Sequence, residues 1–130
     1  MAPRIAIAVA QGVIGLLLLL GIWLGLPARW WPVDVLGTAL GAGALVAAAL
    51  VAAGNPFGLR WATYVIWAEL ALGTLAVTLL CTSMAQLAGS YGPVGNGGAL
   101  LMGTILALIL PYLVGLPILQ LRWIQRAAER

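Results

Sequence analysis

The feature that most constrains this chain is a set of four apolar runs, each long enough to cross a lipid bilayer. About 20 apolar residues span a hydrocarbon core of about 30 Å, and such a segment must satisfy its own backbone hydrogen bonds as a helix. The connections between the runs are short. The sequence therefore predicts an all-α integral membrane protein, a single domain of residues 1–130 built as an antiparallel bundle of four transmembrane helices, at residues 5–26, 35–54, 61–87 and 98–121.

Charged residues are too scarce for a soluble fold. They make up 7% of the chain, against 64% hydrophobic residues, whereas soluble domains contain about a quarter charged residues. The six basic residues are all arginines, and there are three acidic residues and no histidine. This set cannot form the polar shell of a soluble domain. It is also too weakly basic for nucleic-acid binding, so we expect no nucleic-acid partner and expect the lipid bilayer as the surroundings.

The arginines predict the orientation of the helices. With four spans both termini lie on one side, and the opposite side receives only Arg29, beside Asp34. Positive charge collects on the cytoplasmic side, so we expect a multi-pass protein of the cell membrane, the inner membrane where there are two, with both termini cytoplasmic. The last residues, 122–130, predict a short basic helical tail. Its arginines recur every four residues and form a surface suited to anionic lipid headgroups: Arg122, Arg126 and Arg130.

Glu69 is the only acidic residue deep within an apolar run. An ionisable side chain inside a span costs free energy and is a candidate functional residue for that reason. Trp61 marks the start of the span, and a rise of 1.5 Å per residue places Glu69 about 12 Å deeper. No arginine is expected at that depth, so we expect a protonated, neutral carboxyl group.

Two other polar side chains are expected at the depth of Glu69. Counting inward from the same side of the membrane, the first span contributes Gln11 and the fourth contributes Tyr112. The second span offers only small apolar residues there, which leaves room. We therefore predict an intramembrane polar layer formed by Glu69, Gln11 and Tyr112.

Small residues predict where helices pack. Lipid supplies no hydrophobic drive for helix pairing, so close backbone approach through small residues takes its place. In the second span Gly37 and Gly41 form a GxxxG pair, and Ala44 and Ala48 continue nearly the same face. The third span carries Gly73 on the face of Glu69 and a second small face on the opposite side. We expect these two helices to contact a protein partner or another copy of the chain.

Three local features complete the prediction. Asp34 precedes an apolar run and is predicted to be a helix N-cap. Residues 88–98, which are rich in glycine, are predicted to form a flexible loop. Pro111 and Pro117 are predicted to break the fourth helix and to release the carbonyls of Ala107 and Leu113.

Three functions are compatible with an architecture of this kind to different degrees. An enzyme is disfavoured because the chain has no histidine, no pair of intramembrane acids, and no serine or cysteine with an obvious base; we expect no catalytic residue, metal or cofactor. The first remaining function is a non-enzymatic subunit or assembly factor of a larger membrane complex, with Glu69 as a buried hydrogen-bonding anchor. The alternative is a small oligomeric proton-coupled transporter that uses Glu69.

Overall fold

The computed structural model describes residues 2–25 and 30–128. Of these residues 96% are helical and none is in a strand. Four helices are long and apolar enough to cross a membrane, which confirms the all-α class and the number of predicted spans: Pro3–Gly25, Trp31–Ala52, Pro56–Ser90 and Gly92–Ala127.

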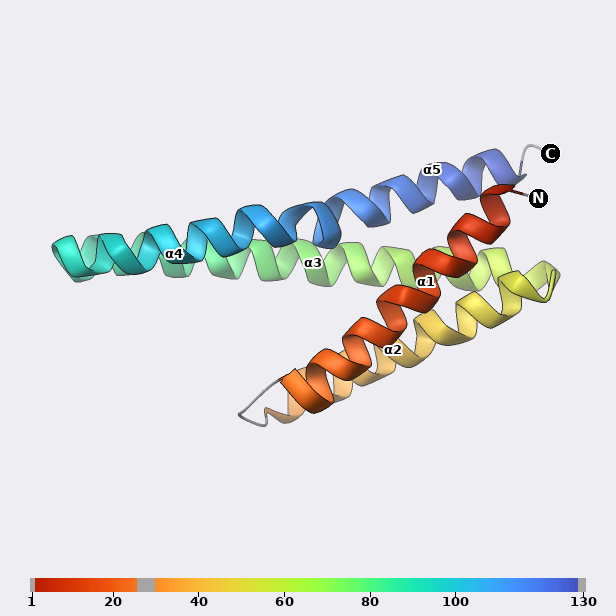
Figure 1. Ribbon diagram of the computed structural model, residues 1–130, viewed down its shortest axis with the longest axis horizontal. Helices are drawn as coiled ribbons and strands as arrows, with labels where there is room; N and C mark the ends of the chain where they lie inside the picture. The colour runs from red at the N-terminus through yellow and green to blue at the C-terminus, as the bar shows by residue number, and fades with distance from the viewer. Residues whose placement is uncertain (1, 26–29, 129–130) are drawn as a thin grey trace. The chain divides into compact units, whose positions relative to one another are not determined.

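The chain is a succession of helical segments with short connections (Figure 1). It divides into two compact units, which we call the first unit, Met1–Ala68 with Leu119–Arg130, and the second unit, Glu69–Ile118. Both boundaries fall within helices. The segments are α1 (Ala2–Leu20), η1 (Gly21–Gly25), α2 (Trp31–Ala52), α3 (Pro56–Ser90), α4 (Gly92–Leu110), η2 (Pro111–Gly115) and α5 (Leu116–Ala128), where η1 and η2 are π-helical turns.

In the first unit, α1 and α2 lie side by side and meet through glycines (Figure 1). A Cβ atom added to Gly15 would lie 2.8 Å from the carbonyl oxygen of Gly41, and one added to Gly41 would lie 3.0 Å from Cγ of Leu19. The first distance is shorter than Cβ atoms adopt, and the second would require the Leu19 side chain to shift. The two backbones therefore approach as closely as they do because neither helix has a side chain at these positions.

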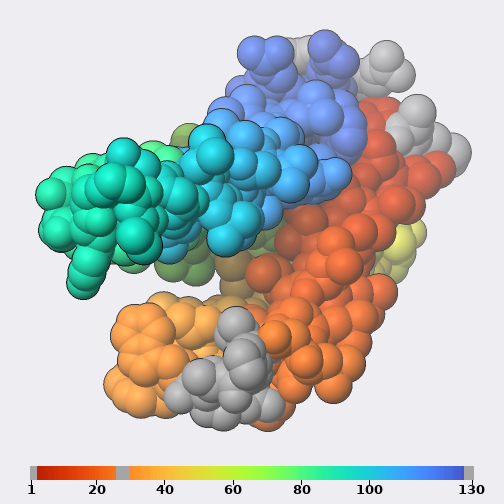
Figure 2. All heavy atoms as spheres, turned by 60° about the vertical axis from the view of Figure 1, so that its left-hand side comes forward, coloured from red at the N-terminus to blue at the C-terminus, as the bar shows by residue number. Residues whose placement is uncertain are grey.

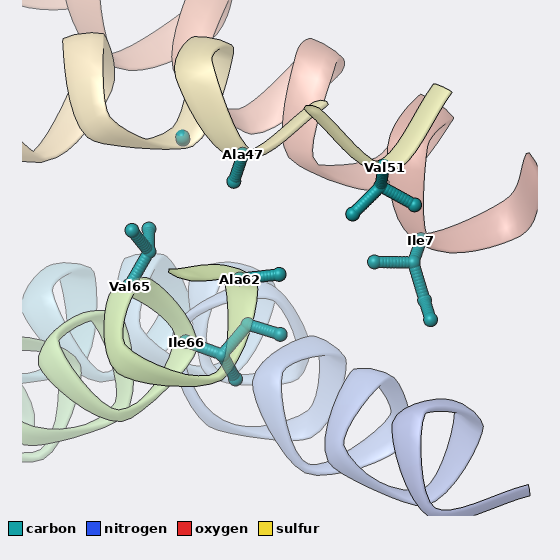
Figure 3. Close-up of a cluster of buried hydrophobic side chains, with 7 residues drawn as sticks. Ile7, Ala47, Val51, Ala62, Val65 and Ile66 are labelled. Atoms are coloured by element: carbon teal, nitrogen blue, oxygen red, sulfur yellow. The ribbon is translucent and has the colours of Figure 1, made fainter. Parts of the chain in front are cut away.

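A cluster of buried aliphatic side chains joins α2 to α1 and to the first turns of α3 (Figure 3). Side chains near the end of α5 pack against this cluster from outside: Leu121, Trp123 and Ile124. The cluster thus gathers parts of the chain that are far apart in sequence into one unit. Its members are Ile7, Ala44, Ala47, Val51, Ala62, Val65 and Ile66.

The connection from α2 to α3 is a tight turn. Gly54 has φ of 70°, a conformation that glycine adopts without steric cost. Its N–H donates to the Val51 carbonyl at 3.1 Å and that of Asn55 donates to the Leu50 carbonyl at 3.0 Å, which is the Schellman pattern of helix ends. The Asn55 side chain then accepts the N–H of Phe57 at 2.9 Å. Asn55 therefore takes part in ending α2 through its N–H and caps α3 through its side chain.

The start of α2 differs from the prediction. The helix begins at Trp31 with a proline in its first positions, so Asp34 lies inside the first turn, and the N-cap assignment is wrong. Proline favours the first helical position because its missing N–H would have no partner there in any case. The Asp34 carboxylate still lies near the N-terminus of α2, where the helix dipole favours negative charge.

The predicted flexible loop at residues 88–98 is also wrong. Helix α3 continues to Ser90, α4 begins at Gly92, and only Tyr91 stands outside the two helices. Gly92 has φ of 55° and makes the turn, while Gly95 lies directly against the Leu87 carbonyl. The glycines thus allow a very tight helical hairpin, and Figure 2 shows the α3 and α4 atoms packed together at this end of the second unit.

Candidate functional site

Glu69 lies near the middle of α3 and is buried, with 7% of its surface exposed. Helix α3 is continuous through this position, so Val65 and Ile66, one turn earlier, share its face. Both of these residues belong to the aliphatic cluster of the first unit. The carboxyl group therefore continues a face of α3 that begins as an apolar packing surface.

A buried pair of amides lies in the first unit. Gln11 of α1 donates through Nε2 to Oε1 of Gln120 on α5 at 2.6 Å, and neither side chain has any exposed surface. A buried polar group is costly unless it is hydrogen-bonded, so the pairing removes part of the penalty of placing two amides in an apolar interior. The bond also fixes the register of α5 on α1.

Gln120 is the one partner of this pair that the sequence prediction missed. It lies two residues before Arg122, and the sequence prediction places an arginine at the membrane surface. Long basic side chains extend to the surface from deeper positions, so an arginine locates the surface only to within about a helical turn. One feature of the sequence could have identified it: Gln120 is the first amide side chain after a long uncharged apolar stretch.

The three residues of the predicted polar layer differ in their surroundings. Gln11 and Glu69 are buried, whereas Tyr112 of η2 is 70% exposed. Gln11 belongs to the first unit, and Glu69 and Tyr112 belong to the second. The grouping of the three side chains at one depth stays a prediction.

The fourth span, which the prolines are predicted to break, stays helical from Gly92 to Ala127 and changes to a π-helical turn at η2. The N–H of Leu116 donates to the carbonyl of Pro111, an i to i+5 bond that widens the helix. Pro117 has no N–H, so it cannot donate to the Leu113 carbonyl as an α-helical residue would. That carbonyl lies directly against Gly73 of α3, and the missing side chain of Gly73 is what admits it.

The other predicted packing residues lie within the first unit. Gly37 lies against Ile22 and Gly41 lies against Gly15 and Leu19. A Cβ on Gly12 would lie 3.8 Å from that of Ala48. Ala44 is fully buried in the aliphatic cluster. The small face of α2 therefore packs within the chain, chiefly against α1.

The second small face of α3 is exposed. We call it the threonine face: Ala71, Thr74, Thr78, Cys81, Thr82 and Ala85, all exposed. Each threonine hydroxyl donates to a backbone carbonyl of its own helix, as Thr78 does to Thr74 at 2.9 Å. The hydroxyls are thus satisfied without a neighbour, and the face presents a nearly smooth surface of small groups.

Of the predicted lipid-facing arginines, Arg122 and Arg126 are exposed on α5, and Arg130 lies outside the described residues. Within residues 2–25 and 30–128, no group of three histidine, cysteine or acidic side chains could hold a metal ion. Comparison with protein-family models, curated proteins and solved structures finds no match to this chain.

Proposed function

We propose that the protein is a non-enzymatic subunit or assembly factor of a larger membrane complex and that its partner binds the threonine face of α3. The observation that carries the proposal is the contrast between the two small faces of the chain. The small face of α2 is covered by α1, whereas the residues of the threonine face are exposed.

The physical argument rests on what small residues do in a bilayer. Lipid tails cover large aliphatic side chains as well as a protein does, so exposed leucines need no partner. Small residues lose contact area in lipid and regain it only when another helix approaches closely.

The topology that accompanies this proposal is an antiparallel four-helix bundle with both termini in the cytoplasm. Its support is the distribution of arginines, because Arg4, Arg60, Arg122 and Arg126 lie at helix ends that four crossings would bring to one side. The threonine face would then extend from the middle of the bilayer to its outer half.

A paired substitution tests the partner surface. Thr78 and Thr104 are both exposed, and each donates at 2.9 Å to the carbonyl four residues earlier. Thr78→Leu adds bulk to the threonine face, whereas Thr104→Leu makes the same change on α4. After purification in mild detergent, intact-complex mass spectrometry should show a partner that is lost in Thr78→Leu and retained in Thr104→Leu. A chain that purifies alone, or equal behaviour of the two variants, would contradict the proposal.

The alternative, a proton-coupled transporter, has one observation in its favour: a buried glutamate occurs in a chain whose fourth span contains the π-helical turn η2. Irregular helices and membrane-embedded acids are among the parts from which transporters build their binding sites. The protein reconstituted alone would then support a pH-dependent flux that Glu69→Gln abolishes with the fold intact. The absence of flux, together with a co-purifying partner, would reject this alternative.

A further inference from the structure

Four arginines gather at one end of the first unit. Arg4 lies in the first turn of α1, Arg60 near the start of α3, and Arg122 and Arg126 in the last part of α5. All four are exposed. In Figure 1 the beginning of α1, the turn between α2 and α3, and the end of α5 lie at the same end of this unit.

The aliphatic cluster explains why these arginines converge. Ile7, one turn after Arg4, is a member of the cluster, and Leu59, next to Arg60, packs against it. On α5, Leu121 and Ile124 also pack against it. The beginning of α1, the beginning of α3 and the end of α5 thus pack around one core. The first two carry one exposed arginine each, and the end of α5 carries two.

The positive charge of this end is not neutralised by the described residues. Asp34 lies in the first turn of α2, Glu69 lies nine residues after Arg60 on α3, and Glu129 lies outside the described residues. None of the four arginines forms an ion pair with an acidic side chain in residues 2–25 and 30–128. Four like charges held together repel one another, and a bound anion would offset that repulsion.

The helices place this charge at a defined depth. Arg4, Arg60 and Arg122 each lie where a membrane-length apolar helix begins or ends, which is the level of the lipid headgroups. Tyr64, one turn along α3 from Arg60, is 71% exposed. An exposed tyrosine between an arginine and an apolar span is typical of the boundary between headgroups and acyl chains.

We propose that the arginine end of the first unit, formed by Arg4, Arg60, Arg122 and Arg126, binds the phosphate headgroup of an anionic phospholipid. Guanidinium groups pair with phosphate oxygens through two parallel hydrogen bonds. A lipid fits better than a soluble phosphate because its acyl chains can lie along the apolar helices that carry the arginines. The site goes beyond the basic surface of α5 alone, since it requires the ends of α1 and α3.

Lipid retention by the full-length protein tests the proposal. The protein is equilibrated with vesicles of phosphatidylglycerol and phosphatidylcholine that share the same acyl chains, extracted in mild detergent and measured by intact mass spectrometry. We expect preferential retention of phosphatidylglycerol, which decreases as the salt concentration rises. Each single substitution of the four arginines by glutamine should reduce the preference roughly fivefold, as expected for one basic residue near a membrane surface.

Three controls decide the outcome. Arg29→Gln removes the same charge from the connection between α1 and α2 and should leave the preference unchanged within about twofold. Arg60→Lys keeps the charge but cannot form the two parallel hydrogen bonds, so it should reduce the preference less than Arg60→Gln does. Glycerol phosphate at equal concentration should not displace the lipid. Equal retention of the two lipids, an equal loss in Arg29→Gln, or displacement by glycerol phosphate would each overturn the proposal, and the first of these is measured on the unaltered chain.

Discussion

The contact between Gly73 and the Leu113 carbonyl can be tested by adding a single methyl group. In Gly73→Ala the new Cβ would overlap the carbonyl oxygen of Leu113, and it would lie 3.2 Å from the carbonyl carbon and 3.3 Å from Cβ of the same residue. The obstacle is backbone, so no side-chain rotation can relieve the overlap. Helix α3 and the η2 turn must move apart.

The magnitude follows from two opposing effects. Overfilling a packed contact costs about 1 to 3 kcal/mol, and replacing glycine by alanine within a helix contributes up to about 1 kcal/mol of stability. Since the overlap here involves a rigid carbonyl, we expect the steric cost to dominate. Gly73→Ala should lower the free energy of unfolding by about 1 to 2 kcal/mol.

Gly97 provides the matched control. It lies within α4 in the same unit, and a Cβ added there would meet nothing within 4 Å. Gly97→Ala should therefore be neutral or stabilising by up to about 1 kcal/mol. Reversible unfolding in mixed micelles, followed by helicity, would measure both variants. If Gly73→Ala were as stable as Gly97→Ala, the close approach of α3 to η2 would be refuted.

Two further predictions concern the first unit. Gln11→Leu or Gln120→Leu should each lower the free energy of unfolding by about 1 to 3 kcal/mol, because each leaves a buried amide without its partner. The double variant should lower it by less than the sum of the two single effects. Strict additivity in a double-mutant cycle would contradict the pairing. Gly54→Ala should cost about 1 to 2 kcal/mol from its positive φ alone, since its Cβ would meet no neighbour. Gly54→Asn should cost less, because asparagine tolerates this conformation. If both variants were as stable as the unaltered chain, the positive φ of Gly54 would be contradicted.

The membrane-protein class could be predicted from the sequence because it depends on composition and run length alone. Any helix that crosses a bilayer must be apolar over about 20 residues, and no tertiary contact changes that requirement. The same holds for the irregular hydrogen bonding of the fourth span, since Pro111 and Pro117 cannot donate backbone hydrogen bonds wherever the helix packs. These features are properties of single segments.

The features that the sequence did not reveal depend on contacts between segments. The glycines of residues 88–98 permit a loop, and they equally permit the backbone of α4 to approach α3, as Gly95 does at Leu87. Only packing distinguishes the two outcomes, and in an apolar environment packing favours the helix because its backbone groups are satisfied. Gln120 was missed for the same reason, since its role is defined by Gln11 on another helix.

The sequence Gly-Leu-Pro occurs at residues 25–27 and again at 115–117, and both times its glycine lies in a π-helical turn. In each case the proline removes the N–H that would bond the carbonyl four residues earlier. Residues 26–29 lie outside the described part of the chain, whereas after Pro117 the fourth span continues as α5. Beyond Pro117, Gln120 bonds to Gln11, and Leu121 and Ile124 pack against the aliphatic cluster. Pro117 thus weakens the hydrogen bonding of the fourth helix, and the contacts that α5 makes beyond this proline stabilise its continuation.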